Sequence, residues 1–107
     1  MTFGINVNNQ EMKFDKYYSF PILRTDDMED LILAFNFQSE YSGTVVIKLY
    51  DNKVEMEEFN LEENIFIVPD YYYYAQGFSF CLCITTNSQI ITTNFLNIPI
   101  KEVFKCM

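Results

Sequence analysis

Residues 65–101 read IFIVPDYYYYAQGFSFCLCITTNSQIITTNFLNIPIK, and this segment indicates an all-β architecture more clearly than any other part of the chain. Along residues 77–85, large apolar side chains alternate with smaller ones, which places on one face Phe78, Phe80, Leu82 and Ile84. Alternation with a period of two is the pattern of a strand that buries one of its faces. The turn residues at 86–88 then reverse the chain, so we expect a strand over residues 89–94 to pair back, followed by another over 95–101.

The same alternation recurs upstream, over residues 30–38 and 44–50. The side chains expected to face the core are Leu31, Leu33, Phe35 and Phe37 in the first strand and Val45, Ile47 and Leu49 in the second. A hairpin turn is expected at Asp51 and Asn52, since both residue types favour turns. Residues 53–59 then return as a polar strand, whose charges are typical of a sheet edge.

Shorter strands complete the expected fold. Residues 64–68 form an apolar run that predicts a short buried strand, and residues 3–7, 12–18 and 22–24 have strand-like composition. Residues 26–30 form either a single helical turn or an acidic loop, and no convincing long helix is present. Many short strands separated by turn signals predict an all-β fold. We expect an immunoglobulin-like antiparallel β-sandwich of two sheets, with a jelly roll as the alternative, and a single domain over residues 1–107.

The charge of the chain narrows the class of partner. Fifteen acidic residues against seven basic ones give a formal net charge of −8 and a pI near 4.3. Such a chain repels phosphate backbones and anionic membrane surfaces, so neither nucleic acid nor membrane is expected as a partner. Residues 1–10 lack the pattern of a secretory signal, and three cysteines form no disulfide-scaffold spacing, so we expect the chain to fold in a cytoplasm.

The residues that most often carry catalysis are missing. The chain has no histidine, which removes the commonest general base and the commonest zinc ligand, and it has no glycine-rich phosphate loop. Cys81 and Cys83 fall on the same face of one strand, where we expect them to pack as small apolar residues. The acidic groups at 26–30 and 55–63 fit a solvated face better than a calcium loop. We therefore expect no enzyme activity, no cofactor and no metal site.

Four successive tyrosines, Tyr71, Tyr72, Tyr73 and Tyr74, follow Pro69 and Asp70. They cannot all face one core, so a short turn or single helical turn is expected to direct two rings inward and two outward. Tyrosine offers a large contact area at a small entropic cost and suits interfaces and sugar stacking. These residues are therefore the candidate interface, and the alternatives are a plug at one end of the sandwich or a sugar-recognition surface.

The order of features along residues 31–101 resembles that of small virion proteins from phages of Gram-positive bacteria. The residues that carry the resemblance are the strand ending at Val68 and Pro69, the aromatic corner, the strand that Gly77 opens, the run ITTN at 91–94 and the run IPIK at 98–101. This pattern is similar to the N-terminal domain of upper baseplate proteins and to head and tail decoration domains. The resemblance implies a non-enzymatic β-sandwich, present in many copies, that contacts other capsid, tail or baseplate proteins in the virion.

Three hypotheses for function follow. The first is a phage virion structural protein, either a capsid-decorating or a tail or baseplate accessory domain that assembles through protein–protein contacts, as a homo-oligomer or in many copies. The second is a carbohydrate- or host-surface-binding module that uses residues 71–74. The third is an inhibitor of a host protein that mimics nucleic acid through its charge, although the apolar strand content argues against it.

Overall fold

The computed structural model describes residues 2–18, 22–24, 30–38, 43–75, 77–98 and 100–102, with the backbone alone at 22–24, 74 and 100–102. The acidic residues at 26–29 lie outside this part of the chain. The elements are, in chain order, β1 Thr2–Asn8, β2 Glu11–Phe14, β3 Ile22–Arg24, β4 Ile32–Phe37, β5 Gly43–Asp51, β6 Val54–Asn60, β7 Ile65–Ile67, the 3₁₀-helix η1 Asp70–Tyr74, β8 Phe78–Thr86, β9 Ile90–Thr92, β10 Leu96–Asn97 and β11 Ile100–Glu102.

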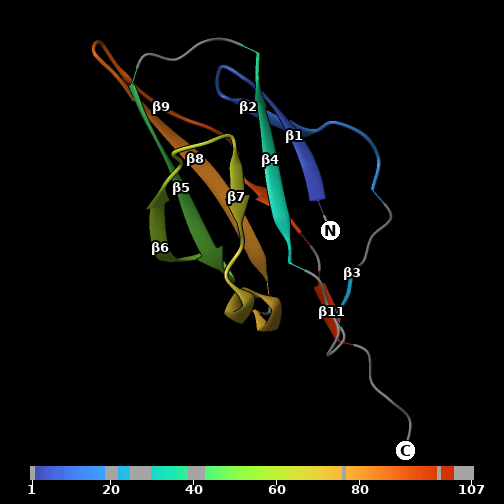
Figure 1. Ribbon diagram of the computed structural model, residues 1–107. Helices are drawn as coiled ribbons and strands as arrows, with labels where there is room; N and C mark the ends of the chain where they lie inside the picture. Colours follow the sequence, from blue (N-terminus) through green and yellow to red (C-terminus); the bar gives the residue numbers. More distant parts are fainter. Residues whose placement is uncertain are drawn as a thin grey trace, which may run out of the picture.

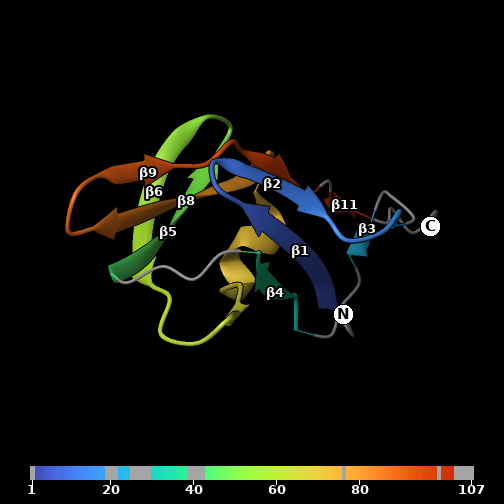
Figure 2. The same cartoon turned by 90° about the horizontal axis from the view of Figure 1, so that it is seen from above.

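The strands form two main sheets. The four-stranded sheet has the order β2-β1-β4-β7, and the five-stranded sheet has the order β10-β8-β5-β6 with β9 also paired to β8. The short pair of β3 and β11 lies beside these sheets (Figure 1). Seen from above, the main sheets form two layers (Figure 2), and η1 lies at one end of them (Figure 1). The prediction of an all-β fold with two sheets is therefore confirmed, and the arrangement is consistent with a β-sandwich.

The expectation of wholly antiparallel sheets is wrong. β1 and β4 pair in parallel, with Thr2 opposite Ile32 and Val7 opposite Phe37, and β3 and β11 also pair in parallel. Parallel neighbours need a long connection, which β2, β3 and the segments between them supply here. A reading of local alternation cannot detect this pairing, because alternation reports which face is buried and not which strand lies alongside.

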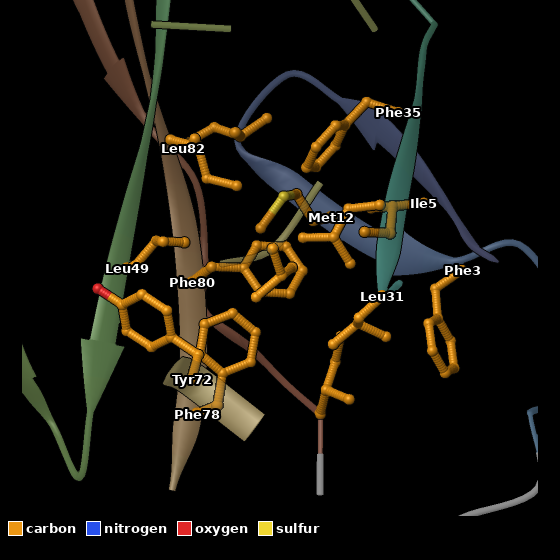
Figure 3. Close-up of a cluster of buried hydrophobic side chains, with 14 of the residues drawn as sticks. Phe3, Ile5, Met12, Leu31, Phe35, Leu49, Tyr72, Phe78, Phe80 and Leu82 are labelled. Atoms are coloured by element: carbon orange, nitrogen blue, oxygen red, sulfur yellow. The ribbon is translucent and has the colours of Figure 1, made fainter. Parts of the chain in front are cut away.

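The core forms where the inner faces of the two sheets meet. Figure 3 shows Phe80 of β8 among side chains of both layers, with Ile5 and Met12 from the four-stranded sheet and Leu49 from the five-stranded sheet. The ring of Phe80 lies edge-on to that of Phe35 of β4, with their centroids 6.2 Å apart. The strands predicted over residues 30–38, 44–50 and 77–85 are thus confirmed, together with their expected inner faces.

The central ladder requires one glycine. β5 and β8 pair over nine residues each, and Gly43 opens β5 opposite Thr86. A Cβ atom at Gly43 would lie 1.8 Å from the carbonyl oxygen of Thr85, so the two backbones approach too closely for any side chain. Glycine is suited to such a close approach because it carries no Cβ atom.

Two other strand predictions need correction. β7 is not buried: Ile65 and Ile67 are 56% and 57% exposed, because β7 is the last strand of its sheet and only Phe66 faces inward. The hairpin after β5 turns at Asn52 and Lys53, one residue later than expected, and both residues have positive φ. Positive φ at both central positions is characteristic of the tight turn that matches the twist of paired strands.

The C-terminal segment divides differently from the prediction. The expected strand over residues 95–101 is two strands, since β10 joins the five-stranded sheet and β11 pairs with β3. The predicted polar edge strand at 53–59 is confirmed as β6, at the end of the five-stranded sheet. Its Glu55 forms an ion pair with Lys48 of β5, at an N–O distance of 3.5 Å.

A single asparagine joins the two sheets at the β2 edge. The side-chain Oδ1 of Asn94 accepts a hydrogen bond from the backbone N of Met12 at 2.6 Å, and its Nδ2 donates to the carbonyl oxygen of Met12 at 3.1 Å. The backbone N of Asn94 also donates to the carbonyl oxygen of Gln10 at 3.1 Å. Asn94 lies two residues after the end of β9, and its amide satisfies backbone groups that β2 would otherwise leave to solvent.

Two phenylalanines, Phe80 in β8 and Phe95 after β9, test the position of the core. Phe80 is fully buried, whereas Phe95 is half exposed and packs on Tyr50 alone among the described rings. Phe80→Ala is expected to lower the free energy of unfolding by about 3–5 kcal/mol, since it removes a buried ring and leaves a cavity. Phe95→Ala, the matched control, is expected to cost less than about 1 kcal/mol. Urea denaturation measures both values, and a similar loss in the two variants would contradict the core described above.

Candidate functional site

The predicted turn after Pro69 is present and is a single turn of 3₁₀-helix, η1. Pro69, the residue before η1, has φ −56° and ψ 138°. Its carbonyl oxygen accepts a hydrogen bond from the backbone N of Tyr72 at 3.1 Å. The backbone N of Ala75 donates to the carbonyl oxygen of Tyr72 and closes the turn. A proline before the first turn suits this geometry, because its φ is already fixed and its missing N–H would have no helical partner.

The three described tyrosine rings of η1 have different surroundings. Tyr72 and Tyr73 are buried, whereas Tyr71 is 56% exposed. The ring of Tyr72 packs against Phe78 at a centroid distance of 5.2 Å, and the hydroxyl oxygen of Tyr73 accepts a hydrogen bond from the backbone N of Leu31 at 2.8 Å. Tyr73 thereby fixes the start of β4 against the helix. The side chain of Tyr74 lies outside the described residues.

A carboxylate of β6 joins the two remaining hydroxyls. Oε1 of Glu57 accepts a hydrogen bond from the hydroxyl of Tyr72 at 2.9 Å and another from the hydroxyl of Tyr71. Burial and the bond to Glu57 raise the pKa of Tyr72 strongly, whereas the pKa of Tyr71 is raised first by its bond to Glu57. We call Glu57, Tyr71, Tyr72 and Tyr73 the tyrosine corner, and it links η1 to the edge of the five-stranded sheet.

The three described rings of η1 divide between the core and the surface. Tyr72 and Tyr73 are buried members of the hydrophobic core, and η1 lies at one end of the two sheets (Figure 1). Among the described rings of η1, only that of Tyr71 is available to a partner or a sugar. The interface over Tyr71, Tyr72, Tyr73 and Tyr74 stays a prediction, and burial narrows its testable part to Tyr71.

A larger exposed apolar surface lies on the outer face of the four-stranded sheet. Ile65 and Ile67 of β7 are opposite Ala34 and Ile32 of β4, and side chains of paired residues lie on the same face of a sheet. Ile32 and Ala34 are half-buried, whereas both residues of β7 are exposed. We call Ile32, Ala34, Ile65 and Ile67 the isoleucine face. It adjoins the outer edge of β7, which pairs with no other strand among the described residues.

The sequence missed the isoleucine face for a physical reason. A continuous apolar run such as IFIV is typical of a strand covered on both sides, and neither periodicity nor composition reveals that one side is open. A useful sign was the pair Glu62 and Glu63 just before the run, since charges beside an apolar strand often protect an edge.

The remaining candidate groups are the two cysteines of β8 and the acidic side chains considered as metal ligands. Cys81 and Cys83 are free thiols, and burial raises the pKa of Cys81. No three Cys, Asp or Glu side chains come together as a possible metal site within the part of the chain that the structure describes. Within these described residues, no helix has the length and apolar composition needed to cross a bilayer.

No family model, no curated protein and no solved structure matches the chain. The choice among functions therefore depends on the geometry of its own surfaces.

The hydroxyls of Tyr73 and Tyr71 are expected to differ in their effect on stability. Tyr73→Phe leaves the buried N–H of Leu31 without this acceptor and should lower the free energy of unfolding by about 1–3 kcal/mol. Tyr71→Phe removes an exposed hydroxyl and should leave it nearly unchanged. Thermal or urea denaturation of the two matched variants decides, and equal effects would show that Tyr73 does not anchor β4.

The raised pKa of Tyr72 predicts a loss of stability in alkali. A tyrosine whose pKa is higher in the folded than in the unfolded chain stabilises the fold fully below the unfolded pKa of about 10. That contribution is lost as the pH rises past this value, because the unfolded chain then ionises first. Tyr72→Phe should make the free energy of unfolding fall less steeply between about pH 9 and 11. An unchanged slope in the variant would contradict the placement of its hydroxyl.

Proposed function

We propose that this chain is a non-enzymatic structural protein of a phage virion, a capsid-decorating or tail or baseplate accessory domain with an immunoglobulin-like sandwich. The observation that carries the proposal is the isoleucine face, where two isoleucines more than half exposed lie beside the outer edge of β7, with which no further described strand pairs. A contiguous exposed apolar surface of this kind marks a site of protein contact. The resemblance of residues 31–101 to small virion proteins supplies the phage context.

The energy available at the isoleucine face is modest. Covering the exposed part of each isoleucine contributes about 1–2 kcal/mol, which by itself gives a weak contact. Weak contacts suffice in an assembly where many copies bind a symmetric surface, since each bound copy raises the effective concentration for the next contact. The geometry therefore suits a protein held in multiple copies better than a tight one-to-one binder.

The charge of the chain favours a partner of another kind over a second copy alone. Two copies, each with a net charge of −8, repel one another unless an interface offsets the repulsion. β6, which carries three glutamates, lies next to β7 in Figure 1, and Glu62 and Glu63 directly precede β7 in the chain. A virion protein with an apolar patch and basic residues around it would complement this side in both hydrophobicity and charge.

Labelling of particles tests the proposal directly. Gold-conjugated antibody against the chain should bind phage particles from the source culture, and the position of the gold separates a head from a tail or baseplate location. Particles without gold label, together with detection of the chain only in the cell lysate, would overturn the proposal.

A double variant tests whether the isoleucine face makes the contact. Ile65→Ser with Ile67→Ser should reduce the amount of chain on particles at least about tenfold, since it removes roughly 2 kcal/mol of apolar contact. The thermal midpoint should stay nearly unchanged because both side chains are exposed. Ile90→Ser is the matched control, an exposed isoleucine on the other sheet, and should leave incorporation unaffected. Equal incorporation of the double variant and the control would contradict the role of this face.

A further inference from the structure

The outer face of the five-stranded sheet carries a pocket of about 420 Å³. Tyr50 of β5, Ser79 of β8 and Asn97 of β10 are direct neighbours across three strands, so their side chains share one face. That face is opposite to the core, because the next residues along the strands, such as Leu49 and Phe80, point inward. Lys53 and Phe95 complete the lining of the pocket.

One wall of the pocket is aromatic and open. The rings of Tyr50 and Phe95 meet edge to face, with centroids 4.9 Å apart and an interplanar angle of 83°. Phe95 nevertheless remains 52% exposed, so Tyr50 holds the ring in place without covering it. An exposed aromatic ring fixed at the side of a pocket is a platform on which an apolar face of a ligand can stack.

The floor of the pocket carries a polar side chain, Ser79, for which the described residues provide no hydrogen-bond partner. Ser79 is only 7% exposed, and no described residue forms a hydrogen bond with its hydroxyl. The side chains of Asn97 and Lys53 also have no hydrogen-bond or ion-pair partner among the described residues. The Ser79 hydroxyl is not a fully buried unpaired atom, and since Ser79 lines the pocket, a hydroxyl of a ligand can pair with it there.

We propose that this pocket binds a neutral pyranose, a single sugar unit of a glycan. A pyranose has an apolar face that stacks on Phe95 and hydroxyls that pair with the Ser79 hydroxyl, the Asn97 amide and the Lys53 ammonium. The volume lies in the lower part of the range of about 300–1,000 Å³ for small-molecule sites. A net charge of −8 opposes anionic sugars, so the neutral class is favoured.

This site goes beyond the assembly proposal and does not depend on it. It lies on the five-stranded sheet, whereas the isoleucine face lies on the four-stranded sheet. It also moves the sugar hypothesis away from residues 71–74, because none of these residues lines the pocket. One molecule can therefore bind an assembly partner and a glycan through opposite faces.

The test is an NMR titration of the full chain with four neutral methyl glycosides, those of glucose, galactose, mannose and N-acetylglucosamine, and with methyl glucuronide as the anionic comparison. At least one neutral glycoside should shift the amide signals of Tyr50, Ser79 and Asn97 with a dissociation constant near the millimolar range. Ser79→Ala and Phe95→Ala should each weaken that binding about tenfold.

Tyr71→Ala is the matched control, since its ring is exposed to nearly the same extent as that of Phe95 but lies on η1. It should bind the glycoside as the wild type does. The proposal is overturned if no neutral glycoside shifts these signals, if methyl glucuronide binds more tightly, or if Tyr71→Ala abolishes binding while the pocket variants retain it. Should Phe95→Ala fail to fold, Ser79→Ala decides, and unchanged affinity there overturns the assignment.

Discussion

The pairing of β5 with β8 is the interaction on which the rest of the structure depends. It is the longest ladder described, and it places Phe80 and Leu82 against the four-stranded sheet while Ser79 and Cys81 are also sheltered on the other side. The ladder continues beyond the two strands, because the backbone N of Asn52 donates to the carbonyl oxygen of Gly77, directly before β8, at 2.8 Å. The core, the tyrosine corner and the outer pocket are therefore parts of one rigid arrangement. A strand that is covered on both faces gives a fixed frame for surfaces on either side of it.

The edge strands of the two sheets differ in whether other groups cover them or charged side chains protect them. β2 is closed by the amide of Asn94, and β6 carries glutamates, one of them paired with Lys48. Charged edges and covered edges resist the addition of another strand. β7 has neither protection within its own three residues, and its outward isoleucines continue the half-buried side chains of β4. Apolar exposure therefore accompanies a strand edge at β7, where no charged side chain lies within the strand, whereas at β6 the exposed Val54 and Met56 alternate with glutamates.

Local features of the fold could be predicted from the sequence, and non-local ones could not. The alternation in β4, β5 and β8 identifies their buried faces because a period of two is a property of the strand itself. The exposure of β7, the parallel pairing of β1 with β4 and the bond from Tyr72 to Glu57 depend on which distant segments meet. The run of tyrosines implied that some rings face inward, but only the position of β4 and β6 determines which. The pocket could not be predicted from the sequence for the same reason, since its residues come from three strands and two connecting segments.

The amide bridge of Asn94 has a consequence for how the chain folds. Its bonds to Met12 join residues 82 positions apart, so almost the whole chain must be in place before they form. Closing so long a loop costs more entropy than any hairpin in the molecule, and such contacts form late on the folding path. A contact absent from the transition state slows unfolding without speeding folding. Loss of the Asn94 amide is therefore expected to speed the separation of the two sheets more than it slows their assembly.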